Sequence, residues 1–321
     1  GADAPLLLNY AATGINNGLV EGYGIFGLVA DAAMSEPYYQ VDDTVMYGPI
    51  QPEFKDYMSM IHEWYEDGVI WLDLLYYTDF QNPPTDVVLA DRAGVFYAEV
   101  TYIATLEDAS NTEGFELVAI PDFVRNPGDT IPFKEERAYA ASTPWSISTQ
   151  CQYPELLMQW CNYMYTDEGA LLCNYGMEGE TFEYDADGVP HFSDLINNNP
   201  TYDYRTAIFI YVMDSGPTVV DPMRGTGNYT QEQLDSWDQW QDANLDYSHV
   251  IPNKVTLAAE NTEFNSIQSD IDTFLDEMTV KYITGEYSFD DYDTDFVEAL
   301  KGMNAERMVE LYQDAYDDYK A

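Results

Sequence analysis

Four residues close together in the chain carry the groups that can hold a polar ligand: Tyr97, Glu99, Thr101 and Tyr102. Glu99 stands out among the acids because it lies in an otherwise apolar segment, residues 93–100, which is predicted to be a buried strand. A carboxylate there can accept hydrogen bonds from ligand hydroxyls, cap the following helix, or pair with an arginine. The two tyrosine rings add apolar faces and phenolic hydroxyls. The cluster therefore indicates a binding site, with the capping and ion-pairing roles of Glu99 left open.

Two further groups of residues have similar potential. Tyr23 and Phe26 lie in a Gly-rich stretch, residues 14–27, where neighbouring glycines leave a ring face unobstructed. Arg224 is one of the few cations of the chain and lies in a predicted loop. Its guanidinium can bind a carboxylate or sugar hydroxyls, or form a structural ion pair. The Gly-rich stretch has the spacing of no phosphate-binding loop.

Catalytic and metal-binding patterns do not emerge from the sequence. The three histidines, His62, His191 and His249, lack the spacing of a zinc site, and no Gly-x-Ser-x-Gly nucleophile elbow is present. The segment 185–188 is similar to the start of a calcium loop, but position twelve is Ile196 rather than a glutamate, and a hairpin turn explains it better. We therefore expect no catalytic residue, metal or cofactor.

The three cysteines, Cys151, Cys161 and Cys173, match no metal or redox pattern. An odd number excludes full pairing within the chain, and buried free thiols are the prediction.

Composition limits the class of partner. The 321 residues suffice for two domains, and a hydrophobic content of 46% indicates a globular chain. Lys and Arg number 12 against 58 Asp and Glu, which gives a net charge of −46. Such a charge repels nucleic acid and anionic membranes, and it disfavours polyanionic substrates without a basic pocket or a metal. The 28 tyrosines suit a sugar-binding cleft, but they also suit helix packing.

Hydrophobic periodicity predicts most of the elements. Residues 52–67 form the clearest helix, with proline in the first turn and Gly68 after its end. Further helices are expected at 25–34, 102–109, from 154 onward, and at 166–172, 231–246, 264–283, 291–301 and 304–319. Strands are expected at 5–11, 93–100 and 115–121, a β-hairpin at 181–192, and loops at 195–204 and 214–230. No apolar run is long enough to span a membrane, and no secretion signal begins the chain.

The C-terminal part of the chain carries the most specific motifs. A helix ends in Ile283-Thr-Gly-Glu286, an acidic spacer follows, and a Tyr-rich helix completes the sequence. This order resembles the C-terminal end of extracellular solute-binding proteins, the receptors that feed ABC importers, and in particular their oligosaccharide-type lipoprotein branch. A second resemblance to this family lies in the middle of the chain. A helix is followed by a strand that contains Gly94, then by a helix, a strand and Pro121, which is the order of elements in the family. The segment 174–179 also resembles a motif of the family.

The resemblance implies an α/β fold of the periplasmic-binding-protein type II, with two lobes, a hinge and a ligand between the lobes. Family members are longer, so two explanations are open: the N-terminal half-lobe is truncated, or the chain is a compact variant. Under truncation, residues 1–130 would form the second α/β lobe. Residues 131–250 would return through the first lobe and include the hairpin 181–192, and residues 251–321 would be C-terminal helices packing on the second lobe.

The resemblance also implies roles for individual residues. In the family, the strand-to-helix junction gives the ligand an aromatic platform, which makes Tyr102 the ring expected to stack on a sugar. Trp145, after Pro144, lies where the chain crosses between lobes and is expected to line the pocket. The predicted ligand-binding set is Tyr23, Phe26, Tyr97, Glu99, Tyr102, Trp145 and Arg224.

The predicted function is to bind an extracellular solute, an oligosaccharide, and to deliver it to an ABC transporter permease without breaking a bond. The protein would be a monomer in the periplasm or at the outer face of the membrane, held only by a lipid anchor upstream of this chain. Two alternatives stay open. A glycoside hydrolase would use cleft carboxylates and lose turnover in Glu99→Gln. An acidic surface adhesion module would expose a large apolar patch instead of a cleft.

Overall fold

The chain divides into two compact units. The computed structural model describes residues 7–8, 37–70, 85–96, 100–121, 123–132, 146–186, 188–202, 204–212, 218–219, 221, 224, 229–241, 245–252, 255, 257 and 261–321. Unit 1 consists of Gly1–Glu136 together with Ser236–Ala321, and unit 2 is Arg137–Asp235. The assignment of residues 1–130, 131–250 and 251–321 to lobes stays a prediction.

Unit 1 combines short strands with long helices. Its described strands are β1 (Leu7–Leu8), β2 (Tyr38–Val41), β3 (Thr44–Tyr47), β4 (Val95–Phe96), β5 (Ile131–Pro132) and β8 (Leu245–Asp246). Its α-helices are α2 (Pro52–Glu66), α3 (Thr85–Leu89), α4 (Tyr102–Ala109), α10 (Thr262–Ile283), α11 (Glu298–Gly302) and α12 (Ala305–Lys320); α9 (Gln231–Gln241) runs into it from unit 2. A 3-10 turn at Gly48–Ile50 precedes α2, and a 3-10 turn at Phe289–Asp291 and a π-helical turn at Asp293–Val297 lie before α11. The pairs β1–β4 and β5–β8 are parallel, whereas β2–β3 is antiparallel.

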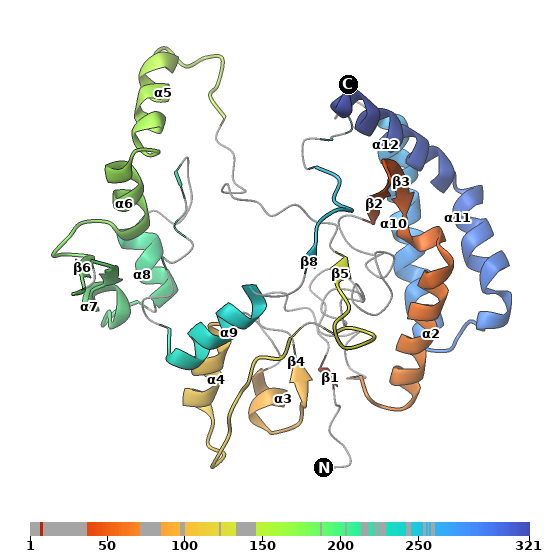
Figure 1. Cartoon of the computed structure of the whole chain (residues 1–321), viewed down its shortest axis with the longest axis horizontal. Helices are drawn as coiled ribbons and strands as arrows, with labels where there is room; N and C mark the ends of the chain where they lie inside the picture. Colours follow the sequence, from red (N-terminus) through yellow and green to blue (C-terminus); the bar gives the residue numbers. More distant parts are fainter. Residues whose placement is uncertain are drawn as a thin grey trace. The chain divides into compact units, whose positions relative to one another are not determined.

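An aromatic core holds the helices of unit 1 together. Figure 1 shows α2, α10, α11 and α12 side by side, and α10 contacts both α2 and α12. Tyr282 of α10 and Phe296 are fully buried between them, with ring centroids 5.9 Å apart in an edge arrangement. Tyr292 stacks on Phe296 at 4.8 Å, and Phe54 of α2 lies 5.8 Å from the same ring. Buried aromatic side chains contribute the largest apolar areas, so this core supplies most of the driving force for packing.

Some of these buried tyrosines keep a hydroxyl without a partner. Among the described residues, the buried hydroxyls without a hydrogen bond are those of Tyr47, Thr279, Tyr282 and Tyr292. A buried hydroxyl without a partner costs free energy relative to its hydrated state. Burial also raises the pKa of Tyr282 to about 12.

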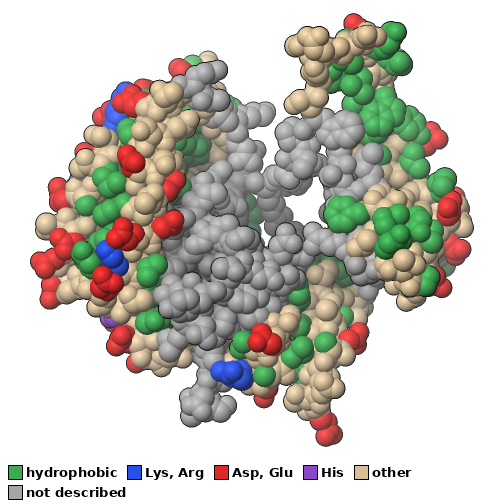
Figure 2. Space-filling view, turned by 180° about the vertical axis from the view of Figure 1, so that it is seen from behind, with side chains coloured by type: hydrophobic (Ala, Val, Ile, Leu, Met, Phe, Trp, Pro, Cys, Tyr) green, Lys and Arg blue, Asp and Glu red, His purple; other side chains and the backbone are tan. Residues whose placement is uncertain are grey.

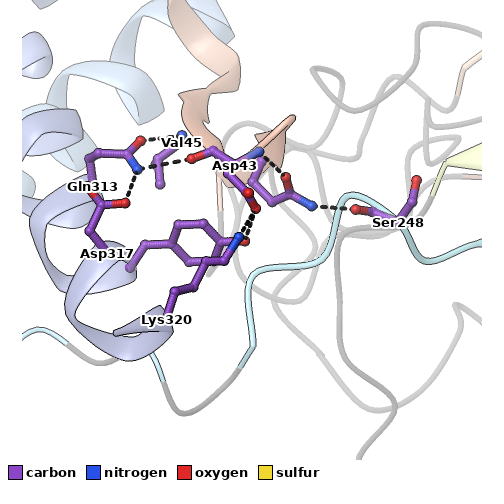
Figure 3. A network of polar contacts seen from close by, with 8 residues as sticks. Asp43, Val45, Ser248, Gln313, Asp317 and Lys320 are labelled. Atoms are coloured by element: carbon purple, nitrogen blue, oxygen red, sulfur yellow. Dashed lines mark hydrogen bonds and ion pairs between the residues drawn. The ribbon is translucent and has the colours of Figure 1, made fainter.

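Three polar side chains of the last helix join it to the β2–β3 hairpin of unit 1. The β2–β3 turn places Asp42 and Asp43 at φ 49° and 66°, in the left-handed region. Figure 3 shows how Gln313 of α12 fastens this hairpin: its Oε1 accepts from the Val45 amide at 2.7 Å, and its Nε2 donates to the Asp43 carbonyl at 3.0 Å. Tyr316 donates its hydroxyl proton to Asp43 at 3.1 Å, and Lys320 pairs with the same carboxylate. These two partners hold the pKa of Asp43 below its usual value.

Unit 2 is mostly helical, with one hairpin. It contains α5 (Pro154–Tyr163), α6 (Asp167–Tyr175), α7 (Asp194–Asn197) and α8 (Tyr204–Tyr211), together with β6 (Phe182–Tyr184) and β7 (Pro190–Phe192). The two strands are antiparallel, so the hairpin predicted at 181–192 is confirmed. Thr166 caps α6 by accepting from the Gly169 amide at 3.1 Å. Its buried hydrophobic cluster consists of Tyr175, Phe182, Phe192, Ile196, Ala207, Ile208 and Val212.

The predicted helices are confirmed at 102–109, from 154 onward, at 264–283 and at 304–319, and the 52–67 helix is present as α2. The helix at 166–172 extends to Tyr175. The segment 291–301 is helical in part, because a π-helical turn separates its start from α11. The region 195–204 was expected to be loop, yet it holds most of α7, which Ser193 caps by accepting from the Leu195 amide. The expected helix at 25–34 lies outside the described residues.

The strand predicted at 115–121 is wrong, because no strand occurs in this fully described segment. The backbone groups of this segment form hydrogen bonds with side chains instead of with a neighbouring strand. The Leu117 amide donates to Glu107 Oε1 at 2.8 Å, and the Ile120 carbonyl accepts from Trp240 Nε1 at 3.0 Å. The prediction that α9 continues to residue 246 is also wrong, because Leu245–Asp246 is paired as β8 with β5.

Tyr292→Phe removes one of the buried hydroxyls without a partner. We expect the free energy of unfolding to stay unchanged or to rise by about 1 kcal/mol, since no hydrogen bond is lost. The matched control Tyr316→Phe removes the hydroxyl that donates to Asp43 and should lower stability by about 1 kcal/mol. Urea titration of both variants measures the difference. A loss in Tyr292→Phe as large as in the control would show that its hydroxyl has a partner.

Unit 1 should lose stability in alkali. Burial raises the pKa of Tyr39 and of Tyr282 to about 12 from 10.0, so the unfolded chain releases these protons at lower pH than the folded chain. Their contribution is fully present below pH 10.0 and is lost as pH rises toward about 12. Urea midpoints at increasing pH measure this loss, and Tyr282→Phe should reduce its steepness above pH 10.0. Identical slopes for the variant and the parent chain would contradict the expectation.

Candidate functional site

Two residues of the predicted ligand-binding set lie among the described residues, Tyr102 and Arg224. The other five, Tyr23, Phe26, Tyr97, Glu99 and Trp145, lie outside them. Tyr102 belongs to unit 1 and Arg224 to unit 2, and each is placed within its own unit.

Tyr102 is the first residue of α4, directly after the segment that begins with β4. Its ring is half-buried and packs on a small cluster formed by Val87, Val88 and Leu106. This packing restrains the ring and leaves part of the side chain accessible. A ring held in this way loses little conformational entropy when it stacks on a ligand.

Arg224 follows a segment that is held firmly against α6. Its backbone amide donates to the Asp221 carbonyl at 3.1 Å, which closes a turn. The side chain is half-buried. The position of this cation therefore depends on what holds Asp221.

Asn174 of α6 holds that segment, although sequence reasoning did not single it out. Its side chain is buried and forms three hydrogen bonds. Nδ2 donates to the Ala170 and Val219 carbonyls, both at 2.8 Å, and Oδ1 accepts from the Asp221 amide at 2.9 Å. Because one amide satisfies backbone groups on both sides of residue 220, it ties the segment to the helix.

Tyr175, the next residue of α6, fixes the Asp221 side chain. Its hydroxyl donates to Asp221 Oδ2 at 2.9 Å. Burial, and then the hydrogen bond and charge of Asp221, raise the pKa of Tyr175, while the positive charge of Arg224 acts in the opposite direction. The phenol therefore stays protonated and continues to donate across the physiological pH range.

Asp221, Arg224 and Tyr175 thus form a polar group that we call the Asp221 cluster. A carboxylate, a guanidinium and a phenol are the groups that bind sugar hydroxyls, and they are equally suited to fixing a loop. Asn174 and Tyr175 are more than forty residues away from Asp221 in sequence. No local spacing therefore links the two segments, and only the folded structure brings them together.

Unit 2 also exposes many apolar side chains. A shallow depression of about 430 Å³ is lined by Leu172, Gly176, Met177, Ile210, Tyr211 and Val212. Leu156 and Trp160 of α5 are 64% and 45% exposed, and Phe209 of α8 is 55% exposed. Figure 2 shows hydrophobic side chains gathered on unit 2, at the right of that view. The depression offers few polar partners, so it suits an apolar surface better than a sugar.

Neither a metal site nor a membrane span is found in the part of the chain that the structure describes. Its His, Cys, Asp and Glu side chains form no group of three or more that could hold a metal ion. Its helices include none long and apolar enough to cross a bilayer. Within this part, Cys161 and Cys173 are buried free thiols, as predicted, whereas Cys151 is half-exposed.

Comparison with known proteins identifies the fold. No protein-family model matches the chain, and no curated protein matches it in sequence. Solved structures do match. An alginate-binding protein, AlgQ2, solved without calcium ion, aligns with a TM-score of 0.66 and 17% identity over 98% of this chain and 64% of that one. An HMO-binding solute-binding protein associated with an ABC transporter, from Bifidobacterium longum infantis, aligns with a TM-score of 0.66 and 15% identity over 99% of this chain and 65% of that one.

A third match is FusA of Streptococcus pneumoniae, an ABC-transporter substrate-binding protein solved as an EF-hand mutant in complex with fructo-nystose. It aligns with a TM-score of 0.62 and 14% identity over 99% of this chain and 64% of that one. These matches show the α/β periplasmic-binding-protein fold with two lobes, as predicted. The chain spans about two thirds of the length of each of these structures.

Asn174→Ala should detach the segment that carries the Asp221 cluster. Three hydrogen bonds are lost and buried backbone groups are left without partners, so we expect a loss of about 2 to 4 kcal/mol in the free energy of unfolding. Asn198→Ala is the matched control, since this exposed amide donates to the exposed Asp194 carboxylate at 2.8 Å and its loss should cost less than about 1 kcal/mol. Urea titration compares the two variants, and equal losses would contradict the anchoring role of Asn174.

Proposed function

We propose that this chain binds an extracellular oligosaccharide and delivers it to the permease of an ABC transporter, without chemical change to the ligand. The observation that carries the proposal is the match of nearly the whole chain to two ABC-transporter binding proteins, one that binds HMO and one solved with fructo-nystose. The 28 tyrosines and six tryptophans of the sequence supply the aromatic faces on which sugars stack.

The proposed mechanism is hinge closure. The glycan stacks on aromatic rings, and binding shifts the equilibrium between an open and a closed form by the difference in its affinity for the two. The proposed ligand contacts are Tyr102 and Arg224, with Tyr23, Phe26, Tyr97, Glu99 and Trp145 from outside the described residues. In this proposal Asp221 and Tyr175 position Arg224.

Delivery to a permease needs a surface that contacts another protein. The exposed apolar side chains of α5 and α8 support such a contact, because a patch of this kind on a surface marks an interaction site. The same observation favours a protein-binding role, which is the alternative that predicted an exposed apolar patch. Location outside the cell, a lipid anchor and a monomeric state are further parts of the proposal.

Calorimetric titration with a panel of oligosaccharides tests the function. We expect at least one glycan to bind with micromolar or tighter affinity and to remain intact, as checked by chromatography after incubation. Tyr102→Ala should weaken binding by about tenfold or more through the loss of stacking. Tyr319→Ala, at an exposed position in α12, is the control and should leave affinity unchanged.

Two outcomes would contradict this proposal. If no glycan in the panel gives a heat of binding, whereas a peptide or a metal ion does, the proposed ligand class is refuted. Cleavage of the bound glycan would instead favour the hydrolase. Thermal unfolding of Tyr102→Ala must be measured as well, because the ring also packs on Val87, Val88 and Leu106.

A further inference from the structure

Acidic side chains accompany many of the cations that the structure describes. Lys281 Nζ lies 2.6 Å from Glu277, and Lys301 Nζ lies 3.1 Å from Glu298. Arg307 pairs with Glu263 and Glu310 at 3.1 and 3.0 Å, and Lys320 pairs with Asp43. In Figure 2 the few basic side chains lie among acidic ones. These pairs leave no local excess of positive charge at their positions.

Unit 2 is poorer still in cations. Its sequence contains no lysine, and its arginines are Arg137, Arg205 and Arg224. Arg224 lies in the same turn as Asp221, whose carboxylate Tyr175 holds at 2.9 Å. A guanidinium that shares its surroundings with a fixed carboxylate offers little net positive charge to an anion.

The remaining charge sets a long-range field. A net charge of −46 on a chain of this size produces a negative potential of several kT at the surface. At about 0.1 M salt this potential extends roughly 10 Å into solution. A carboxylate brought to such a surface should lose about tenfold or more in affinity. A neutral glycan presents only dipoles, so the field leaves its affinity almost unchanged.

We propose that the ligand of this chain is an uncharged oligosaccharide, and that the acidic surface excludes glycans that carry carboxylates. This inference rests on the proposed function and narrows its substrate class. Selection by a long-range field needs no specific contact, so it acts on an approaching glycan before any side chain touches it.

A matched set of three ligands tests the inference. The first is the neutral oligosaccharide that binds best in the calorimetric panel. The second is the same oligosaccharide oxidised at a primary hydroxyl to a carboxylate, and the third is the methyl ester of that acid, which keeps the added carbonyl but removes the charge. Each is titrated into the full chain at about 10 mM and about 300 mM NaCl, conditions that shorten the Debye length from roughly 30 Å to well under 10 Å.

We expect the neutral glycan and the ester to bind with dissociation constants within about threefold of each other at both salt concentrations. The acid should bind at least about tenfold more weakly at low salt, and the gap should narrow at high salt. The inference is overturned if the acid binds as tightly as the neutral glycan, if added salt weakens the acid further, or if the ester binds as poorly as the acid. Absence of binding by every neutral and acidic glycan refutes the proposed function itself, and the inference with it. A panel in which only acidic glycans bind refutes the inference alone.

Discussion

The burial of Tyr282 and Phe296 is the constraint on which unit 1 depends. Phe54 of α2 and Tyr292 pack on the Phe296 ring, so α2, α10 and the turn before α11 share one aromatic core. This arrangement joins residues near 50 to residues near 290. The core also contains buried hydroxyls that have no hydrogen-bond partner. The gain from burying large rings exceeds the cost of those hydroxyls, because each ring removes a large apolar area from water. The short strand pairs of unit 1 contribute little by comparison.

Unit 2 is organised differently, around polar side chains as much as around its small hydrophobic cluster. Asn174 and Tyr175 are neighbours on α6, and together they set both the backbone and the carboxylate of Asp221. The backbone of Arg224 is therefore held indirectly by α6, because its amide bonds to Asp221 and Asp221 bonds to Asn174. A residue whose backbone is held in this way loses less conformational entropy when it contacts a ligand than a residue on a free loop would lose.

Periodicity in the sequence predicted the long helices because their apolar residues recur at helical spacing and their ends carry clear signals, such as Pro52 and Thr166. It failed where side chains from distant segments replaced strand pairing, as at 115–121, where Glu107 and Trp240 bind the backbone. It also missed the β2–β3 hairpin, since Asp42 and Asp43 take the left-handed turn positions that glycine or asparagine normally marks. Of the candidate site, the sequence indicated Tyr102 and Arg224, but it could not indicate Asn174 as the anchor. That role exists only because two segments distant in sequence meet in the fold.

The uneven distribution of two side-chain types between the units has a practical consequence. Every lysine of the sequence lies in unit 1, and all three cysteines lie in unit 2. Of those cysteines, Cys151 is half-exposed, whereas Cys161 and Cys173 are buried. A maleimide dye on Cys151 and a succinimidyl dye on lysine would therefore attach to different units of the native chain without any engineered residue. Energy transfer between the two dyes would then test whether the distance between the units changes, as the proposed hinge closure requires.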